Sequence, residues 1–175
     1  MESSTMLTTT RRGFLMLGAA ATLSACASTM PTLAPAAAAP TPETLTPDQI
    51  MAAVNAVRKA NGAPPWSYSQ SLENAARSQA RLMAQRDTLS HDLGVTLRER
   101  VTEAGYIGAV GENLARGHTS LEAALQGWMN SAGHRGTLLS PKFTEFGLAV
   151  TRTPAGRLYW ALIAGGSFDA WRVYQ

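Results

Sequence analysis

Two of the chain's three histidines and one carboxylate have the chemistry of a binding or catalytic site. His91 stands in the tract SHD, Glu112 in GENLARG and His134 in WMNSAGHRGTLL. Two neutral imidazoles and a carboxylate can bind a zinc-like or copper-like ion, with water as the fourth ligand. The same side chains could equally form a hydrogen-bonded polar network without an ion. The spacing alone does not decide between them, because no local ligand motif such as H-E-x-x-H is present.

These tracts together resemble the signature blocks of the CAP superfamily (cysteine-rich secretory proteins, antigen 5 and plant pathogenesis-related proteins) in its compact bacterial form. The resemblance extends to NAVR at 55–58, FTEFGLAV at 143–150 and Tyr159-Trp160, and it covers roughly residues 46–165. Several motifs in order are far more specific than any one of them. The resemblance implies an α+β fold, an α/β/α sandwich with a small antiparallel sheet between helical layers. It also implies that the two histidines and the glutamate line one open cleft.

The chain departs from the better-known eukaryotic members, which have two histidines and two glutamates in this cleft. The resemblance puts their second glutamate near Ser131 and their second histidine near Tyr159, and His134 replaces that histidine, as in other bacterial-type sequences. The set of four is therefore not carried over intact. The metal ligands that the resemblance implies are His91, Glu112 and His134. The cleft neighbours that it implies are Ser131, Tyr159 and Asn113.

A serine nucleophile is the sharper alternative, because Ser131 and His134 are three residues apart and could meet on one helical face. Acyl transfer also needs an oxyanion hole and an oriented base, and the chain has no G-x-S-x-G turn. We therefore favour Ser131 as a cap at a helix end. The remaining histidine, His118, stands between a glycine and a helix start and is expected to face solvent.

The first 45 residues are typical of export rather than of a fold. Residues 1–25 are predicted to be a twin-arginine signal peptide, since Arg11-Arg12 precede an apolar stretch too short to span a membrane. Leu23-Ser24-Ala25-Cys26 matches a lipobox, so Cys26, the only cysteine, is expected to carry lipid and attach the protein to a cell-envelope membrane. A plain secretory signal with an incidental cysteine is the alternative. Residues 26–45 are rich in Ala, Pro and Thr and are predicted to be a disordered tether.

The charge after cleavage is nearly even. Of 15 basic and 12 acidic residues, Arg11, Arg12 and Glu2 fall in the signal peptide, which leaves 13 against 11. Scattered basic residues with a net charge of +2 argue against a nucleic-acid partner. Because the domain predicted for residues 46–175 has no cysteine, it must be stable through packing alone, unlike most eukaryotic relatives, which have disulfides.

The pattern along residues 46–175 predicts alternating helices and short strands. Thr46 and Thr119 each begin a capping box, and Gly133 is expected to break the later helix. The predicted helices are 46–61, 71–86, 96–104 and 119–132, and the predicted strands are 106–110, 147–152 and 158–164.

The leading interpretation is a lipid-anchored, non-enzymatic module that binds a lipid, a sterol or a protein partner, with a divalent metal such as zinc as an optional ligand and no required cofactor. The alternative is a metal-dependent hydrolase or protease of the envelope. In that alternative Glu112 or His91 would be the general base for a metal-bound water.

Overall fold

The computed structural model describes residues 41–172. The predicted signal peptide, the lipobox with Cys26 and most of the predicted tether lie outside the described residues. Among the described residues, no helix combines the length and apolar character needed to cross a membrane.

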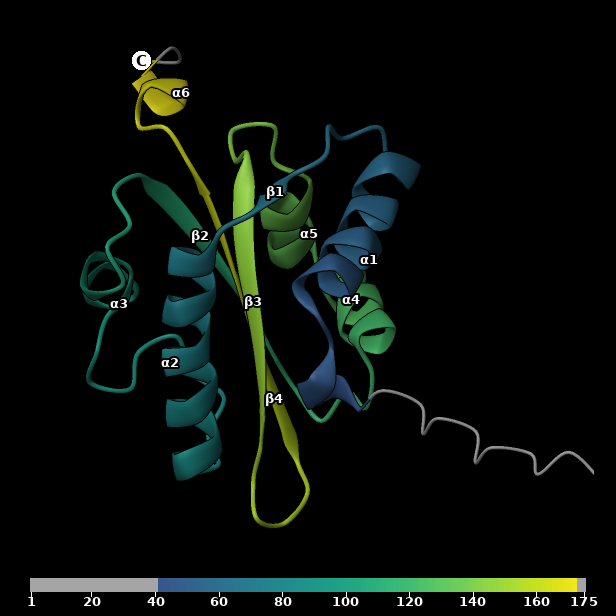
Figure 1. The fold of residues 1–175 in the computed structure, drawn as a ribbon, viewed down its shortest axis with the longest axis vertical. Coiled ribbons are helices and arrows are strands. Elements are labelled where there is room, and N and C mark those ends of the chain that lie inside the picture. The colour runs from purple at the N-terminus through teal and green to yellow at the C-terminus, as the bar shows by residue number, and fades with distance from the viewer. Residues whose placement is uncertain (1–40, 173–175) are drawn as a thin grey trace, which may run out of the picture. The chain divides into compact units, whose positions relative to one another are not determined.

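A four-stranded mixed sheet forms the centre of the domain (Figure 1). Its strands are β1 (Ser67–Tyr68), β2 (Ala109–Arg116), β3 (Glu145–Arg152) and β4 (Leu158–Gly166), in the order β1-β3-β4-β2. The β2–β4 and β3–β4 pairs are antiparallel, as predicted, but β1 pairs in parallel with β3. The predicted antiparallel sheet is thus extended at one edge by a two-residue parallel strand that was not predicted.

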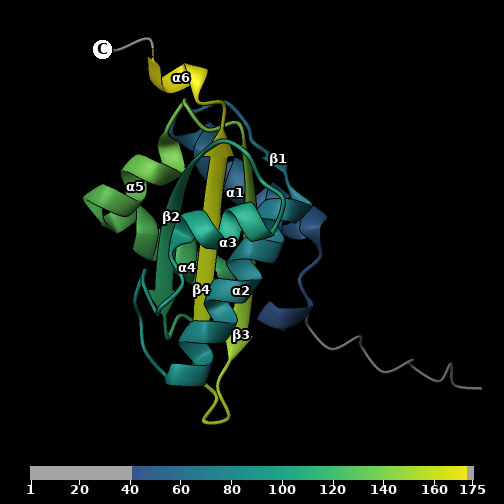
Figure 2. The same cartoon turned by 90° about the vertical axis from the view of Figure 1, so that its left-hand side faces the viewer.

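Helices cover both faces of this sheet (Figures 1 and 2). The helices on one face are α2 (Gln70–Arg86) and α3 (Leu97–Glu103). Those on the other are α1 (Pro47–Ala60), α4 (Leu121–Asn130) and α5 (Ala132–Leu139), and the short α6 (Asp169–Arg172) follows β4. The predicted α/β/α sandwich is confirmed.

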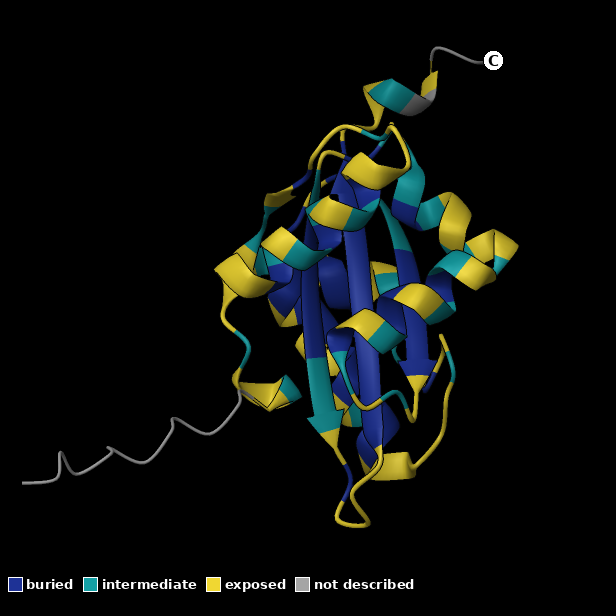
Figure 3. Cartoon of the chain, turned by 90° about the vertical axis from the view of Figure 1, so that its right-hand side faces the viewer, coloured by how far each residue is buried: buried dark blue, intermediate teal, exposed yellow. Residues whose placement is uncertain are grey.

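Strand β4 separates two apolar cores, and all nine of its residues are buried (Figure 3). Side chains of a strand alternate between faces, so Trp160 and Leu162 enter the core under α1 and α4 while Ala161 and Ile163 enter the core under α2. Packing on both faces, with no disulfide in the described residues, holds the domain together.

The helix starts follow from local capping. Thr46 and Thr96 form complete capping boxes with the residues three positions later. The cap of α4 is Ser120, whose hydroxyl accepts from the Ala123 amide, so the capping box predicted at Thr119 is wrong. The break that was predicted at Gly133 falls at Ser131, where the backbone is extended between α4 and α5.

The folded part begins before Thr46. Residues Pro42–Thr44, predicted as tether, form a 3-10 turn, η1, that packs on β3. Glu43 pairs there with Arg152, with Nε–Oε1 and Nη2–Oε2 distances of 2.5 and 3.0 Å. Leu45 packs against the core under α1. The described part of the tether region is thus an integral edge of the domain.

Candidate functional site

Glu112 lies on the edge strand β2, with its side chain on the face that α3 covers. Only 2% of that side chain is exposed. Its Oε1 accepts a hydrogen bond of 2.8 Å from Nη2 of Arg100, a residue of α3 whose side chain is fully buried. A buried carboxylate needs such a partner, because an unpaired charge would be costly in this environment.

His91 supplies the other partner of this carboxylate from the loop between α2 and α3. Its Nδ1 lies 2.7 Å from Glu112 Oε2, although 63% of its side chain is exposed. Gln79 donates to the Ser90 carbonyl at 2.5 Å, and Arg100 donates to the His91 carbonyl at 3.4 Å. These two hydrogen bonds hold the backbone of the loop. The Glu112 carboxylate accepts the hydrogen on Nδ1 of His91, so in the neutral ring Nε2 is the hydrogen-bond acceptor.

His134 approaches the same edge from the other face of the sheet. Neighbouring residues of a strand point to opposite faces, so Asn113 points toward α5, where its Nδ2 donates to the His134 carbonyl at 2.9 Å. Partial burial lowers the pKa of His134, and the nearby His91 lowers it further. Both effects favour the neutral form of His134.

The geometry gives Glu112 a supporting role. Both of its oxygens are already hydrogen-bonded, one to Arg100 and one to His91. A metal at this edge would therefore find two imidazoles and no free carboxylate, short of the three protein ligands typical of zinc enzymes. Within residues 41–172 no three His, Cys, Asp or Glu side chains come together to hold a metal ion. In this structure the Glu112 carboxylate is shared between Arg100 and His91.

The predicted cleft neighbours fall in different places. Asn113 belongs to the site through His134. Ser131 occupies the cap position between α4 and α5, but its hydroxyl makes no capping hydrogen bond, so only the position was predicted correctly. It shows no contact that would activate it as a nucleophile.

Tyr159 does not lie in the cleft. It pairs with Arg116 on β2, four positions from Glu112, or about 13 Å along the strand. Its ring is fully buried, and its hydroxyl donates to Asp87 at 2.9 Å. In this chain Tyr159 holds the C-terminal end of α2 through its hydrogen bond to the cap residue Asp87.

The third histidine, His118, is partly buried and packs against Gly127, where a Cβ would approach its Nε2 to 2.7 Å. Its carbonyl accepts from the Trp160 indole at 2.9 Å. The prediction that it faces solvent is therefore only partly right.

Motif reasoning missed Arg100 and Gln79, which bind Glu112 and the backbone of the His91 loop. A helical period would have found Arg100, because it shares the inward face of α3 with Leu97, Val101 and Ala104. A charged residue on an apolar helical face indicates a buried partner. In the NAVR tract, Asn55 and Arg58 donate to the carbonyls of Trp66 and Pro64 after α1, and Arg58 also donates to the Leu138 carbonyl in the last turn of α5.

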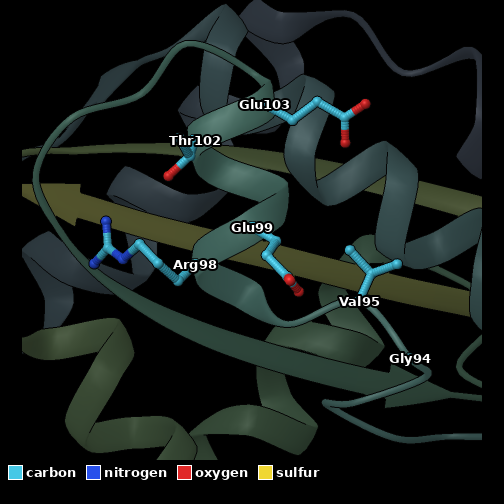
Figure 4. Close-up of a pocket in the computed structure, with 6 residues that line it drawn as sticks. All are labelled: Gly94, Val95, Arg98, Glu99, Thr102 and Glu103. Carbon is cyan, nitrogen blue, oxygen red and sulfur yellow. The ribbon is translucent and has the colours of Figure 1, made fainter.

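A hollow on the outer side of α3 lies apart from this chemistry (Figure 4). The labelled side chains extend from it in different directions, and its charged residues Arg98, Glu99 and Glu103 are all exposed. No polar groups converge there as they do at the β2 edge.

The fold is an α/β/α sandwich that carries a hydrogen-bonded His–Glu pair on an edge strand. Comparison of the chain with known protein families shows which family it belongs to. The model of the cysteine-rich secretory protein (CAP) family matches residues 51–163. The chain therefore belongs to this family.

Several bacterial proteins are similar to the chain. An extracellular protein containing a SCP domain from Bacillus anthracis str. Ames superposes with a TM-score of 0.62 at 29% identity, covering 69% of this chain and 40% of that one. An outer surface protein from Borrelia burgdorferi has the same fold, with a TM-score of 0.62 at 21% identity, covering 69% and 91%.

Two Bacillus subtilis (strain 168) proteins match in sequence. They are the uncharacterized protein YkwD, 28% identical over 57% of this chain and 40% of its own length, and the uncharacterized membrane protein YlbC, 30% identical over 63% and 33%. The chain thus spans 40% or less of the length of these curated relatives.

Proposed function

We propose that this chain is an exported CAP domain, attached to a membrane by lipid on Cys26, that works as a non-enzymatic binding module. The twin-arginine and lipobox motifs support export and attachment. Similarity to proteins described as extracellular or outer-surface supports a location of this domain outside the cytoplasmic membrane.

The observation that carries the non-enzymatic assignment is the engagement of Glu112. A general base must be free to take a proton from water within hydrogen-bond reach. Glu112 has 2% of its side chain exposed and both oxygens hydrogen-bonded. It orients His91 instead, in the way that a supporting carboxylate fixes the tautomer of a histidine.

The binding surface is the β2 edge, where His91 and His134 offer imidazoles to a protein or lipid partner. The lowered pKa of His134 favours its neutral form, and 63% of the His91 side chain is exposed to solvent. Zn²⁺ serves as a probe of this surface, because neutral imidazoles bind it and must lose protons to do so.

The test is zinc titration calorimetry on the wild type and on His91→Ala, His134→Ala and His118→Ala. Two side chains should give only weak binding that fades as pH falls through about 6.5. Loss of either His91 or His134 should remove it, while His118→Ala should leave it unchanged. A tight stoichiometric site that Glu112→Gln also abolishes would contradict the proposal and favour the metal-dependent hydrolase.

Attachment is tested separately in cells. Cys26→Ser should abolish lipid labelling and move the protein to the soluble fraction. A wild type that is unlabelled and freely soluble would instead favour cleavage as a plain secreted protein.

A further inference from the structure

Arginines gather at the end of the sheet where the β3–β4 hairpin turns, the lower end in Figure 1. Two come from the last two turns of α2, two from the final residues of β2 and β3, and one from the hairpin: Arg81, Arg86, Arg116, Arg152 and Arg157. All five are exposed. The Tyr159 hydroxyl lowers the pKa of Asp87 most, and Arg157 and Arg116 lower it further. Arg81 and Arg152 line one hollow, and Arg152 and Arg157 line another, so these four arginines adjoin one another, and Arg86 directly precedes Asp87.

This end holds the net charge of the domain. Residues 41–172 contain 13 basic and 11 acidic residues, because Arg11, Arg12 and Glu2 precede them and 173–175 carry none. Three carboxylates share the end with the five arginines: Glu43, Asp87 and Glu122 on the first turn of α4. The rest of the domain therefore has eight basic and eight acidic residues. The excess of two positive charges is local.

The arginines are available to an external anion. Arg81, Arg86 and Arg116 make no ion pair or side-chain hydrogen bond among the described residues. Arg152 and Arg157 pair with carboxylates that are 30% and 52% exposed. Exposed ion pairs of this kind contribute little to stability, so the arginine can exchange its carboxylate partner for another anion.

The polypeptide also enters the domain at this end. The Glu43–Arg152 pair fixes η1 against β3, so the residues before Thr41 join the domain beside the arginines. If Cys26 carries lipid, as proposed above, 14 residues separate it from Thr41, and a chain of this length spans at most about 50 Å. The arginine-rich end is then the part of the domain nearest the membrane.

We propose that the arginine-rich end docks on the anionic phospholipid surface of the membrane that holds the anchor. Guanidinium groups bind phosphate oxygens through paired hydrogen bonds, and basic residues near an anionic bilayer are attracted over about a Debye length. Docking in this direction leaves α6, at the opposite end of the sheet, pointing away from the membrane (Figure 1).

The test uses the chain from residue 27 onward, which keeps the tether and every described residue but has no lipid. It should sediment with vesicles of phosphatidylcholine and phosphatidylglycerol, not with phosphatidylcholine alone, and salt should weaken the binding. Replacing Arg81, Arg86 and Arg116 together by Gln should lower the partition coefficient about fivefold per residue, or about a hundredfold in all.

A matched control removes the same charge elsewhere, as Lys59→Gln, Arg135→Gln and Arg172→Gln, all exposed. It should keep most of the binding. Equal losses in both triple variants, equal binding to neutral vesicles, or equal affinity for soluble heparin would each overturn the docking proposal. Because this protein is unlipidated, a failure of lipid labelling at Cys26 in cells is a separate result and leaves the vesicle measurement intact.

Discussion

Replacing Arg100 by Met should be one of the most damaging single changes in the domain. Methionine has a similar length, suits a helix and has no charge. It would leave Glu112 with 2% of its side chain exposed and no cation beside it. It would also remove the hydrogen bonds that tie the carbonyls of Val95 and His91 to α3.

The expected cost is about 3–5 kcal/mol, because removing one partner of a buried ion pair strands the other charge. For a domain of this size, that loss lowers the melting temperature by roughly 10–15 °C. The double variant Arg100→Met with Glu112→Met should cost much less than the sum of the single changes, since an apolar pair of similar volume can replace a buried ion pair.

The assay is urea denaturation followed by tryptophan fluorescence, with Arg98→Met as the matched control on the same helix. Arg98 is exposed and makes one hydrogen bond, to the Gly108 carbonyl, so its loss should change stability by less than about 1 kcal/mol. If Arg100→Met behaves like Arg98→Met, or if the costs of the single changes at Arg100 and Glu112 simply add, Arg100 does not hold Glu112 in place and the argument for this site fails.

Four further substitutions can be measured by the same urea denaturation. Gly147→Ala should destabilise the domain by at least about 1–3 kcal/mol, because the new Cβ would lie 1.9 Å from the backbone nitrogen of Glu73. Gly133→Ala should stabilise the domain by about 0.5–1 kcal/mol, because Gly133 lies inside α5 and a Cβ there has open space. Trp128→Ala should cost about 3–5 kcal/mol, since the ring is 1% exposed. The pKa of His134 is lowered on folding, so stability should be full above about pH 6.5 and fall as pH drops through the folded pKa, and His134→Gln should flatten that slope.

The sequence predicted the helices best where a local signal was complete. The capping box at Thr46 and the apolar spacing after it need no tertiary information. The predicted strand ended at Val110, and residues 111–116 of β2 were missed because Gly111, Glu112 and Asn113 look like a loop. Two of these polar side chains are buried in the strand, and the partners that make this tolerable, Arg100 and the His134 carbonyl, come from distant parts of the chain.

The candidate site was predicted in composition but not in geometry. His91 and Glu112 are hydrogen-bonded, and burial together with the nearby His91 lowers the pKa of His134. Tyr159 was misplaced because its position depends on the β2–β4 register, which no local pattern gives. The two-residue strand β1 is too short to show a period at all.

The buried Arg100–Glu112 pair bears on what the site is for. A well-packed apolar pair would usually be as stable, because the desolvation of two charges offsets much of their attraction. The pair therefore contributes more to position than to stability. What it positions is a histidine with 63% of its side chain exposed, on a loop whose backbone Gln79 and Arg100 also bind. Glu112 is hydrogen-bonded through both oxygens and so fixes the ring of His91. Under the function proposed above, that exposed ring is what a partner at the β2 edge would contact.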